Sequence, residues 1–174
     1  MSLILRHNPE AGNITLDAEG WAKVSEVLNA LRRKYGTISR TELNELVATN
    51  DKQRFAFNAH GDKIRASQGH SVEVDLALPE TEPPLELYHG TKNKFIGSIF
   101  HEGLKRGTRQ HVHLSKDVAT AIIVGNRRAG ESIILVVDTT KVSSPFYLSA
   151  NGVWLADAVP PEALTIFQGL EENE

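Results

Sequence analysis

The chain of 174 residues contains no cysteine. This absence excludes disulfides, thiolate catalysis and cysteine-ligated zinc. No apolar run approaches the ~18 residues that a membrane span needs, and the apolar start of the chain is too short for a secretory signal. We therefore expect a protein without membrane segments, located in the cytoplasm and built as one large or two small domains.

The sequence also lacks a strong excess of charge of either sign, with a formal net charge of −3. Residues 1–76 carry ten basic and ten acidic side chains, and residues 86–168 carry nine and seven. The acidic excess lies in the proline-rich passage 77–85 and in the tail 169–174. Contacts with a nucleic acid would therefore depend on a few well-placed arginines rather than on a broad basic field.

The proline-rich passage predicts a linker over 77–85 between two lobes. Before it, apolar spacing predicts an amphipathic helix over residues 23–34. A second helix starts at a capping box formed by Ser39 and Glu42, and we expect its buried face to carry Leu43, Leu46 and Val47. Residues 54–66 are typical of a β-hairpin.

Helices followed by a hairpin indicate a winged-helix lobe over residues 1–76, a frequent nucleic-acid platform, although fold alone does not establish function. A short strand and turn over residues 16–21 should place Trp21 in the core of this lobe.

After the linker, residues 86–168 read as a second lobe with many short strands and few helices. Strands are expected at 87–91, at 132–138 and after the turn pair Asn151-Gly152. Helices are expected over 95–104, with Gly103 at the C-cap, and over 117–124. The predicted fold class is therefore α+β.

Polar side chains gather at the end of the strand at 87–91. His89 can donate or accept a hydrogen bond, and Thr91 adds a hydroxyl. Gly90 would let a ligand approach bare backbone, so a Gly90→Val change should block the ligand while the fold stays nearly intact. The alternative is a strand followed by a tight turn, with His89 satisfied locally.

Two further clusters lie in the first lobe. Arg6 and His7 end a short helix that Pro9 stops, where a helix dipole also favours cations. Just after the hairpin come Arg65, Gln68, His70 and Ser71, a density of donors suited to an oxyanion. A polar loop at the domain edge would have the same composition.

His111 and His113 should point to one face of a strand, with Val112 and Leu114 on the other. Two histidines on one face can bind a metal, but no carboxylate or cysteine stands at ligand spacing beside them in the sequence. We therefore predict no metal.

Together these motifs resemble the RNA 2′-phosphotransferase family, whose members remove a splice-junction 2′-phosphate from tRNA with NAD. The pieces that carry the resemblance occur in the family's order and cover residues 3 to about 167: Leu5-Arg6-His7-Asn8-Pro9, Gly20-Trp21, Asp51-Lys52-Gln53-Arg54-Phe55, Ile64-Arg65-Ala66-Ser67-Gln68-Gly69-His70-Ser71, Leu87-Tyr88-His89-Gly90-Thr91, His111-Val112-His113-Leu114-Ser115, Val124-Gly125-Asn126-Arg127 and Asn151-Gly152-Val153-Trp154-Leu155.

The resemblance implies a winged-helix lobe that holds the RNA phosphate and a C-terminal lobe of the ADP-ribosyltransferase fold that holds NAD, without a metal. The family's catalytic residues fall on Arg6, His7, Arg65 and Arg127, and its substrate contacts on Gln68, His70 and Ser71. The NAD contacts fall on His89, Gly90, Thr91, His113, Ser115, Asn151 and Gly152. Arg128 stands where the family usually has histidine, so Arg127 is chosen by its alignment to Val124-Gly125.

Two other interpretations remain open. His89-Gly90-Thr91 and His113-Leu114-Ser115 also fit the paired triplets of metal-independent two-histidine 2′,3′-cyclic phosphodiesterases, although they start only 24 residues apart. A winged-helix module that binds nucleic acid without chemistry is the third possibility. The implied partners are a 2′-phosphorylated RNA and NAD, and we expect a monomer.

Overall fold

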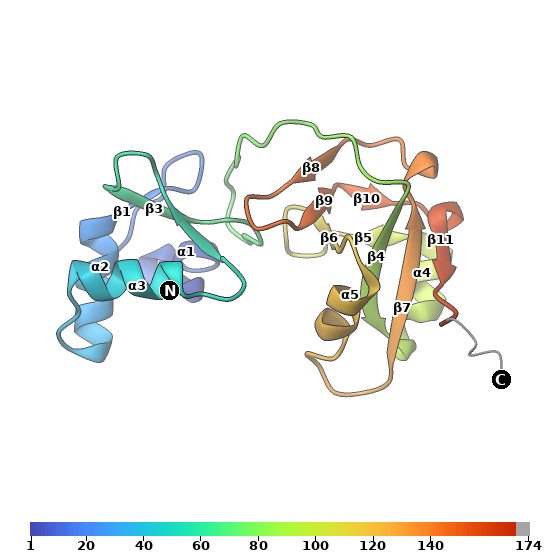
Figure 1. Ribbon diagram of the computed structural model, residues 1–174, viewed down its shortest axis with the longest axis horizontal. Coiled ribbons are helices and arrows are strands. Elements are labelled where there is room, and N and C mark those ends of the chain that lie inside the picture. The colour runs from blue at the N-terminus through green and yellow to red at the C-terminus, as the bar shows by residue number, and fades with distance from the viewer. Residues whose placement is uncertain (170–174) are drawn as a thin grey trace. The chain divides into compact units, whose positions relative to one another are not determined.

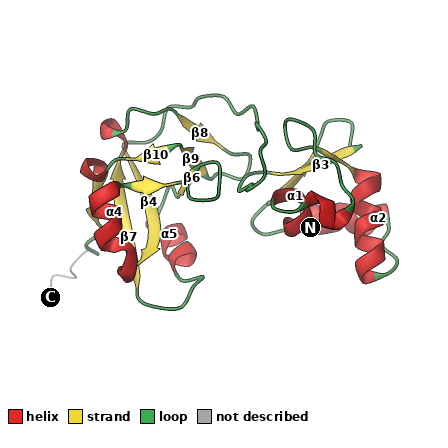
Figure 2. Cartoon of the chain, turned by 180° about the vertical axis from the view of Figure 1, so that it is seen from behind, coloured by secondary structure: helices red, strands yellow, loops and turns green. Residues whose placement is uncertain are grey.

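The computed structural model describes residues 1–169 and has mixed helices and antiparallel sheets, as the predicted α+β class requires (Figures 1 and 2). Its contacts divide the chain into two compact units. Unit 1 contains residues 1–78 together with two short later segments, 108–110 and 149–151. Among the described residues, unit 2 contains 79–107, 111–148 and 152–169. Sequence patterns did not indicate that the two later segments belong to unit 1.

Unit 1 packs three helices and a 3₁₀ turn with a small antiparallel sheet of order β1-β3-β2. Its elements are α1 (Ser2–Arg6), η1 (Pro9–Gly12), β1 (Ala22–Lys23), α2 (Val24–Tyr35), α3 (Arg40–Ala48), β2 (Phe55–Phe57) and β3 (Lys63–Ala66). The expected hairpin is confirmed, because β2 pairs with β3 in the register Ala56↔Arg65.

The predicted helices of unit 1 are also confirmed. Val27 and Leu31 of α2 are buried at helical spacing, and Gly36 ends the helix with a positive φ of 85°. The capping box of α3 is present in both directions between Ser39 and Glu42. Local sequence chemistry therefore sets the bounds of both helices.

Two expectations for unit 1 are wrong. Residues 16–21 form no strand, since β1 begins only at Ala22, and Trp21 lies half-exposed outside the buried core. Leu46 is also exposed, whereas Leu43 is fully buried. Helix α3 therefore buries a narrower stripe than its apolar spacing suggested.

Unit 2 contains more strands than helices. Its elements are β4 (Glu86–Lys92), η2 (Asn93–Phe95), α4 (Ile96–Glu102), β5 (Leu104–Lys105), β6 (Val112–Leu114), α5 (Val118–Gly125), β7 (Ser132–Asp138), η3 (Thr139–Lys141), β8 (Phe146–Leu148), β9 (Trp154–Ala156), β10 (Ala158–Val159), η4 (Pro161–Ala163) and β11 (Leu164–Ile166). The predicted strands and helices of this lobe are therefore present, and Gly103 is the C-cap of α4 as expected.

Antiparallel pairing builds unit 2 from the small sheets β11-β7-β4, β6-β9-β8 and β10-β5. Figure 1 shows α5 alongside β4 and β7, which it contacts. Leu87, Leu135 and Val137 are fully buried in a core that also holds Trp154 at 7% exposure. This core fixes the strand ends that carry the candidate site residues.

The expected linker is bound to unit 2 through its backbone. Thr81 N donates to Phe146 O at 2.8 Å, and the Thr139 hydroxyl donates to Pro84 O at 2.7 Å. Glu80 and Glu82 are exposed, as their charge predicts. The predicted acidic tail lies outside the described residues from residue 170 onward.

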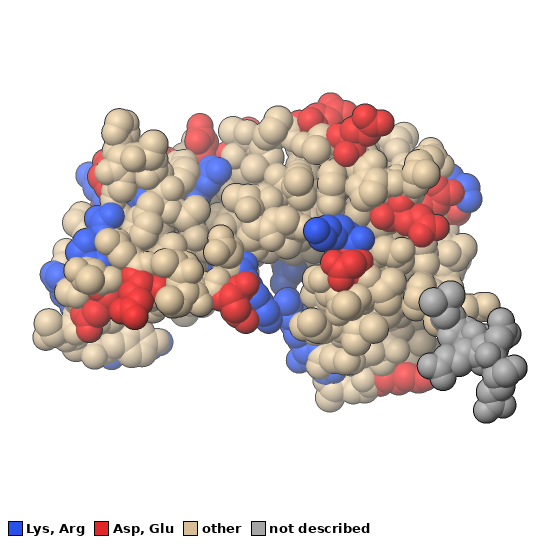
Figure 3. Space-filling view, viewed as in Figure 1, with Lys and Arg blue, Asp and Glu red and all other residues tan. Residues whose placement is uncertain are grey.

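Acidic side chains lie beside basic ones on the face of each unit shown in Figure 3, in keeping with the near-neutral charge sums. Within residues 1–169, no helix combines the length and the apolar character needed to cross a membrane.

Candidate functional site

Arg6, His7 and Ser71 are brought together at the end of α1. The last turn of this helix places Arg6 at its C-terminus and His7 at the C-cap. Ser71 N donates to Arg6 O at 2.9 Å, and the Ser71 hydroxyl lies 2.9 Å from His7 Nδ1. The Arg6 guanidinium lies over the Phe55 ring, 6.0 Å from its centroid. Residues that are 64 positions apart in the sequence thus form one cluster.

Burial and the neighbouring guanidinium groups of Arg6 and Arg109 lower the pKa of His7. A lowered pKa favours the neutral imidazole at pH 7, and a neutral imidazole can accept a proton. His7 is therefore suited to proton transfer at the end of α1.

His70, next to Ser71, is 1% exposed, and neither ring nitrogen has a hydrogen-bond partner among residues 1–169. Burial lowers its pKa to about 4, and the charges of Arg6, Arg65 and His7 act in the same direction. A Cβ on Gly20 would lie 3.3 Å from His70 Nε2, so the glycine leaves room for the ring. A buried imidazole without partners is costly, and here it lies among the candidate phosphate-binding residues.

Stability should therefore depend on the charge of His70. The unfolded chain binds a proton here near the ordinary pKa of 6.5, but the folded chain does so only near 4. The contribution of His70 is complete above pH 6.5 and is lost as the pH falls to 4, which lowers the free energy of unfolding by roughly 3 kcal/mol.

Unfolding of the wild type and of His70→Gln by guanidinium chloride, at several pH values between 4.5 and 7.5, measures this loss of stability. The variant should lose part of the dependence of the free energy of unfolding on pH that the wild type shows. If the free energy of unfolding changed equally with pH in the wild type and in His70→Gln, His70 would not be the source of the pH dependence.

Arg65 lies on β3 and is held by main-chain groups. Its Nη1 donates to Glu19 O at 3.2 Å and to Leu76 O at 3.3 Å. Its guanidinium stacks on the Trp21 ring, 4.4 Å from the centroid. These contacts fix the loops on either side of the strand, and they leave Nε and Nη2 for another acceptor. Gln68 follows in the same loop and is half-exposed.

Arg54 was not selected from the sequence, although it lies in one of the motifs. Ser67 N donates to Arg54 O at 2.9 Å, which continues the β2–β3 ladder and places Arg54 on the same sheet face as Arg65. Arg54 is half-exposed, and its guanidinium makes no hydrogen bond or ion pair with residues 1–169. The predicted hairpin could have indicated Arg54. It lies two residues before Ala56, the strand partner of Arg65, and alternate residues of a strand share one face.

In unit 2, His89, His113 and Ser115 come together. The Tyr88 and Ser115 main chains exchange two hydrogen bonds of 2.8 Å. His89 Nδ1 lies 3.0 Å from His113 O. Since a carbonyl only accepts, Nδ1 carries the proton. Thr91 follows on the same face of β4 as His89 and is half-exposed.

The expectation that a Gly90→Val change would leave the fold nearly intact is wrong. A Cβ on Gly90 would lie 2.1 Å from Ala121 O and 2.7 Å from Gly125 N of α5. The missing side chain therefore lets a helix backbone pack on β4, and a Gly90→Val change would not leave the fold intact. A contact of Gly90 with NAD stays a prediction and would have to involve its main chain.

Asn151 and Gly152 occupy the predicted turn before β9, yet Asn151 is held within unit 1. Its Nδ2 donates to Lys52 O at 3.0 Å, and its Oδ1 accepts from the Ser149 hydroxyl at 2.8 Å. Gly152 has a φ of 77° and nothing within 4 Å of its Cβ position, so the turn needs a glycine for its backbone.

Arg127 and Arg128 are both exposed in the loop that follows α5. Lys92, buried at the end of β4, donates to Gly130 O and to the Ser132 hydroxyl, both at 2.7 Å. The Ser132 hydroxyl in turn donates to Asn126 Oδ1 at 2.7 Å. This network ties both ends of the arginine loop to the sheet.

The alternation expected for β6 is confirmed, with Val112 and Leu114 buried and His111 and His113 half-exposed. A carboxylate does lie near, because His111 Nε2 is 3.8 Å from Asp157 Oδ1. Among residues 1–169, no three His, Cys, Asp or Glu side chains are grouped as metal ligands.

Comparison with known proteins identifies the family of the chain. The sequence profile described as "RNA 2'-phosphotransferase, Tpt1 / KptA family" matches residues 1–158. The chain is 50% identical over 169 residues to a probable RNA 2′-phosphotransferase of Hahella chejuensis, covering 95% of this chain and 90% of that protein. It is 52% identical over 168 residues to one of Rhizobium leguminosarum, with the same coverage, and 49% identical over 176 residues to one of Streptomyces griseus, covering 95% and 93%. The chain therefore belongs to the RNA 2′-phosphotransferase family of enzymes.

Proposed function

We propose that the chain removes a 2′-phosphate from RNA, of the kind left at a tRNA splice junction, with NAD as co-substrate. A phosphate oxygen forms a bond to the ribose carbon of NAD that bears nicotinamide, and nicotinamide leaves. The neighbouring ribose 2″-hydroxyl then forms a bond to phosphorus and loses its proton, while the RNA 2′-oxygen leaves and takes one up. The products are RNA with a 2′-hydroxyl and ADP-ribose 1″,2″-cyclic phosphate.

The observation that carries this proposal is the cluster at the end of α1. Arg6, His7 and Ser71 are joined by hydrogen bonds, and His70 lies buried beside them with no partner of its own among the described residues. Cationic and neutral donors around one point suit the oxygens of a phosphate. Their preorganisation stabilises the charge that develops at phosphorus in the second step.

Arg65 and Arg127 complete the proposed catalytic set, and Gln68 contributes to substrate binding. Part of the Arg65 guanidinium is used to hold the loop that carries Trp21. We therefore add Arg54 as a second arginine of the hairpin that binds the phosphate. An arginine fork gives two parallel hydrogen bonds to phosphate oxygens. Lys92 would act indirectly, by holding the loop that carries Arg127.

For the two units we propose the folds that the family resemblance implies, a winged helix in unit 1 and an ADP-ribosyltransferase fold in unit 2. The helices and three-stranded sheet of unit 1 and the small antiparallel sheets of unit 2 support this assignment.

We assign the NAD contacts to His89, Gly90, Thr91, His113, Ser115, Asn151 and Gly152. The side chains of β4 and of the segment at the end of β6 suit a nucleotide, because the hydrogen bond to His113 O orients the His89 ring and because Thr91 and Ser115 offer hydroxyls. We further propose that the enzyme works as a cytoplasmic monomer.

Turnover should require NAD and should survive EDTA, since the proposed chemistry uses arginine and histidine side chains. The test is to incubate the protein with a 2′-phosphorylated oligonucleotide with and without NAD, and to follow loss of the phosphate on a gel. A two-histidine phosphodiesterase would act on a 2′,3′-cyclic phosphate without NAD. Activity lost to the chelator and restored by a divalent ion would contradict the proposal.

A further inference from the structure

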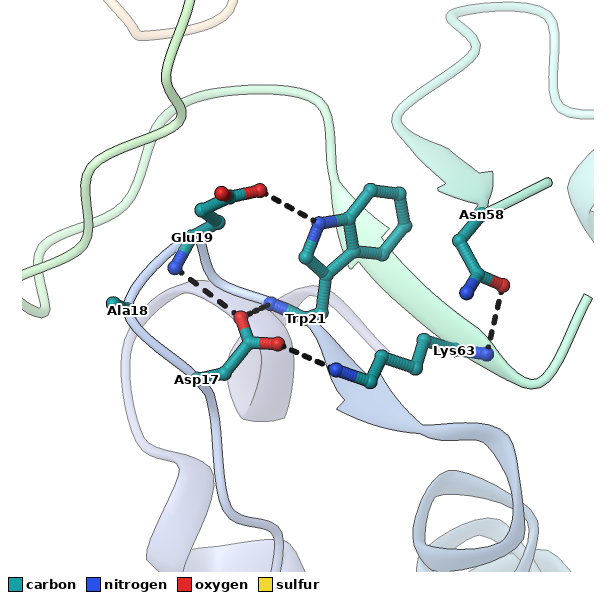
Figure 4. A pocket seen from close by; sticks show the side chains of 6 residues that line it. All are labelled: Asp17, Ala18, Glu19, Trp21, Asn58 and Lys63. Atoms are coloured by element: carbon teal, nitrogen blue, oxygen red, sulfur yellow. Dashed lines mark hydrogen bonds and ion pairs between the residues drawn. The ribbon is translucent and has the colours of Figure 1, made fainter. Parts of the chain in front are cut away.

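Trp21 lines a pocket of unit 1 that the proposed chemistry does not use. The pocket is formed by Asp17, Ala18, Glu19, Trp21, Asn58 and Lys63 (Figure 4). The indole lies outside the hydrophobic core of unit 1 and is partly exposed at this pocket. From this arrangement we infer that Trp21 is a stacking platform for a base of the RNA substrate, and the inference rests on the proposed function.

The indole is held in place before any ligand binds. The Arg65 guanidinium stacks on the ring at 4.4 Å from its centroid. Trp21 Nε1 donates to Glu19 Oε2 at 3.4 Å, and Trp21 N donates to Asp17 Oδ1 at 2.9 Å. A rigid aromatic ring loses little entropy on binding, so it suits a base that must be stacked.

The other walls of the pocket are fixed in the same way. Lys63 extends toward Asp17, and its Nζ donates to Asp17 Oδ2 at 2.8 Å (Figure 4). Burial opposes ionisation of Asp17, but hydrogen bonds from Lys63 and Trp21 outweigh it and lower its pKa. Asn58 Oδ1 accepts from Lys63 N at 3.0 Å, and its Nδ2 donates to Asp62 at 2.7 Å.

The charges of the pocket favour a base over a phosphate. Lys63 and Arg65 are matched by Asp17 and Glu19, which leaves no net positive charge to hold an anion. Glu19 can accept from a base amino group at the edge of the ring, as acidic side chains do with exocyclic amines. Single-stranded RNA is recognised by aromatic stacking together with such edge contacts.

Arg65 connects this pocket with the phosphate cluster. The Arg65 guanidinium stacks on Trp21. Its charge also acts on His70, as do the charges of Arg6 and His7, the residues proposed to bind the phosphate. A base next to the 2′-phosphate is thus the expected occupant, rather than the adenine of NAD, whose proposed contacts lie mainly in unit 2.

The test uses the full chain with Trp154→Phe, which leaves Trp21 as the sole tryptophan, excited at wavelengths that tyrosine does not absorb. A 2′-phosphorylated single-stranded RNA, titrated without NAD, should quench Trp21 emission. An oligonucleotide with an abasic site at the stacked position should bind about 5–150-fold more weakly and lose the quenching. Moving the abasic site along the RNA identifies the base, and this arm leaves Trp21 and its surroundings unchanged.

Two protein variants provide the second arm. Trp21→Ala should weaken RNA binding by a similar factor and leave NAD affinity unchanged, whereas Trp21→Phe should retain most of the RNA affinity. Bound RNA with unchanged Trp21 emission, or quenching that survives every abasic position, would overturn the inference and leave the proposed function intact. Quenching by NAD alone would assign the pocket to adenine instead. A protein that binds no RNA would refute the proposed function and this inference together.

Discussion

Arg54→Ala should slow removal of the 2′-phosphate by about 10²–10³-fold and leave the chain folded, the effect typical of losing one donor to the transition state. Its guanidinium makes no hydrogen bond or ion pair with the described residues, so its removal costs little stability. Arg65→Ala should instead lower the free energy of unfolding by roughly 2–3 kcal/mol, because two main-chain carbonyls lose a charged donor.

Single-turnover assays at saturating NAD, combined with urea unfolding of both variants, separate the two roles. Arg54→Lys provides the matched control, since it keeps the charge and loses the fork, and it should recover only part of the rate. A stable Arg65→Ala protein without activity, beside an active Arg54→Ala protein, would show that Arg65 is the hairpin arginine that acts on the phosphate and that Arg54 is not.

Gly90→Val should destabilise unit 2 by more than about 3 kcal/mol, and Gly90→Ala should already be harmful. Even a single Cβ would lie 2.1 Å from Ala121 O, and backbone atoms of a packed helix cannot move aside as a flexible side chain can. We expect α5 to separate from β4, so that loss of NAD affinity in these variants follows from unfolding.

Denaturant unfolding followed through the buried Trp154, in a Trp21→Phe background, measures this effect on unit 2. Gly97→Ala is the matched control, because Gly97 lies inside α4 with nothing within 4 Å of its Cβ position. That change should be neutral or should stabilise the chain by up to about 1 kcal/mol. Equal denaturant midpoints for Gly90→Val and the wild type would show that the stability of unit 2 does not depend on the close packing of α5 on β4.

Local patterns predicted most of the secondary structure, because their causes are local. The capping box of Ser39 and Glu42, the C-cap at Gly103 and the apolar strand β7 depend on residues a few positions apart. Trp21 was misplaced for the opposite reason. Its surroundings come from Arg65, more than forty positions along the chain, and no periodicity of residues 16–21 contains that information.

Part of the candidate site could also be predicted from the sequence. The sequence selected Arg6, His7 and Ser71, and the structure joins them. It selected Arg65 and not Arg54, and the main-chain carbonyls that hold the Arg65 guanidinium cannot be seen in the motif. For Gly90 the sequence did not predict the cost of adding a side chain, because the close approach of the α5 backbone to β4 is not visible in the motif.

The two late segments of unit 1 bear on how the chain folds during synthesis. The Gln110 side chain donates to Val72 O at 3.3 Å, and Asn151 donates to Lys52 O at 3.0 Å. Domains usually fold from the N-terminus as they leave the ribosome. Here the first 78 residues would emerge without either contact, and unit 1 would complete its hydrogen bonds only after residue 151 had been made. Translation of the segments 79–107 and 111–148 of unit 2 is thus a condition for finishing unit 1.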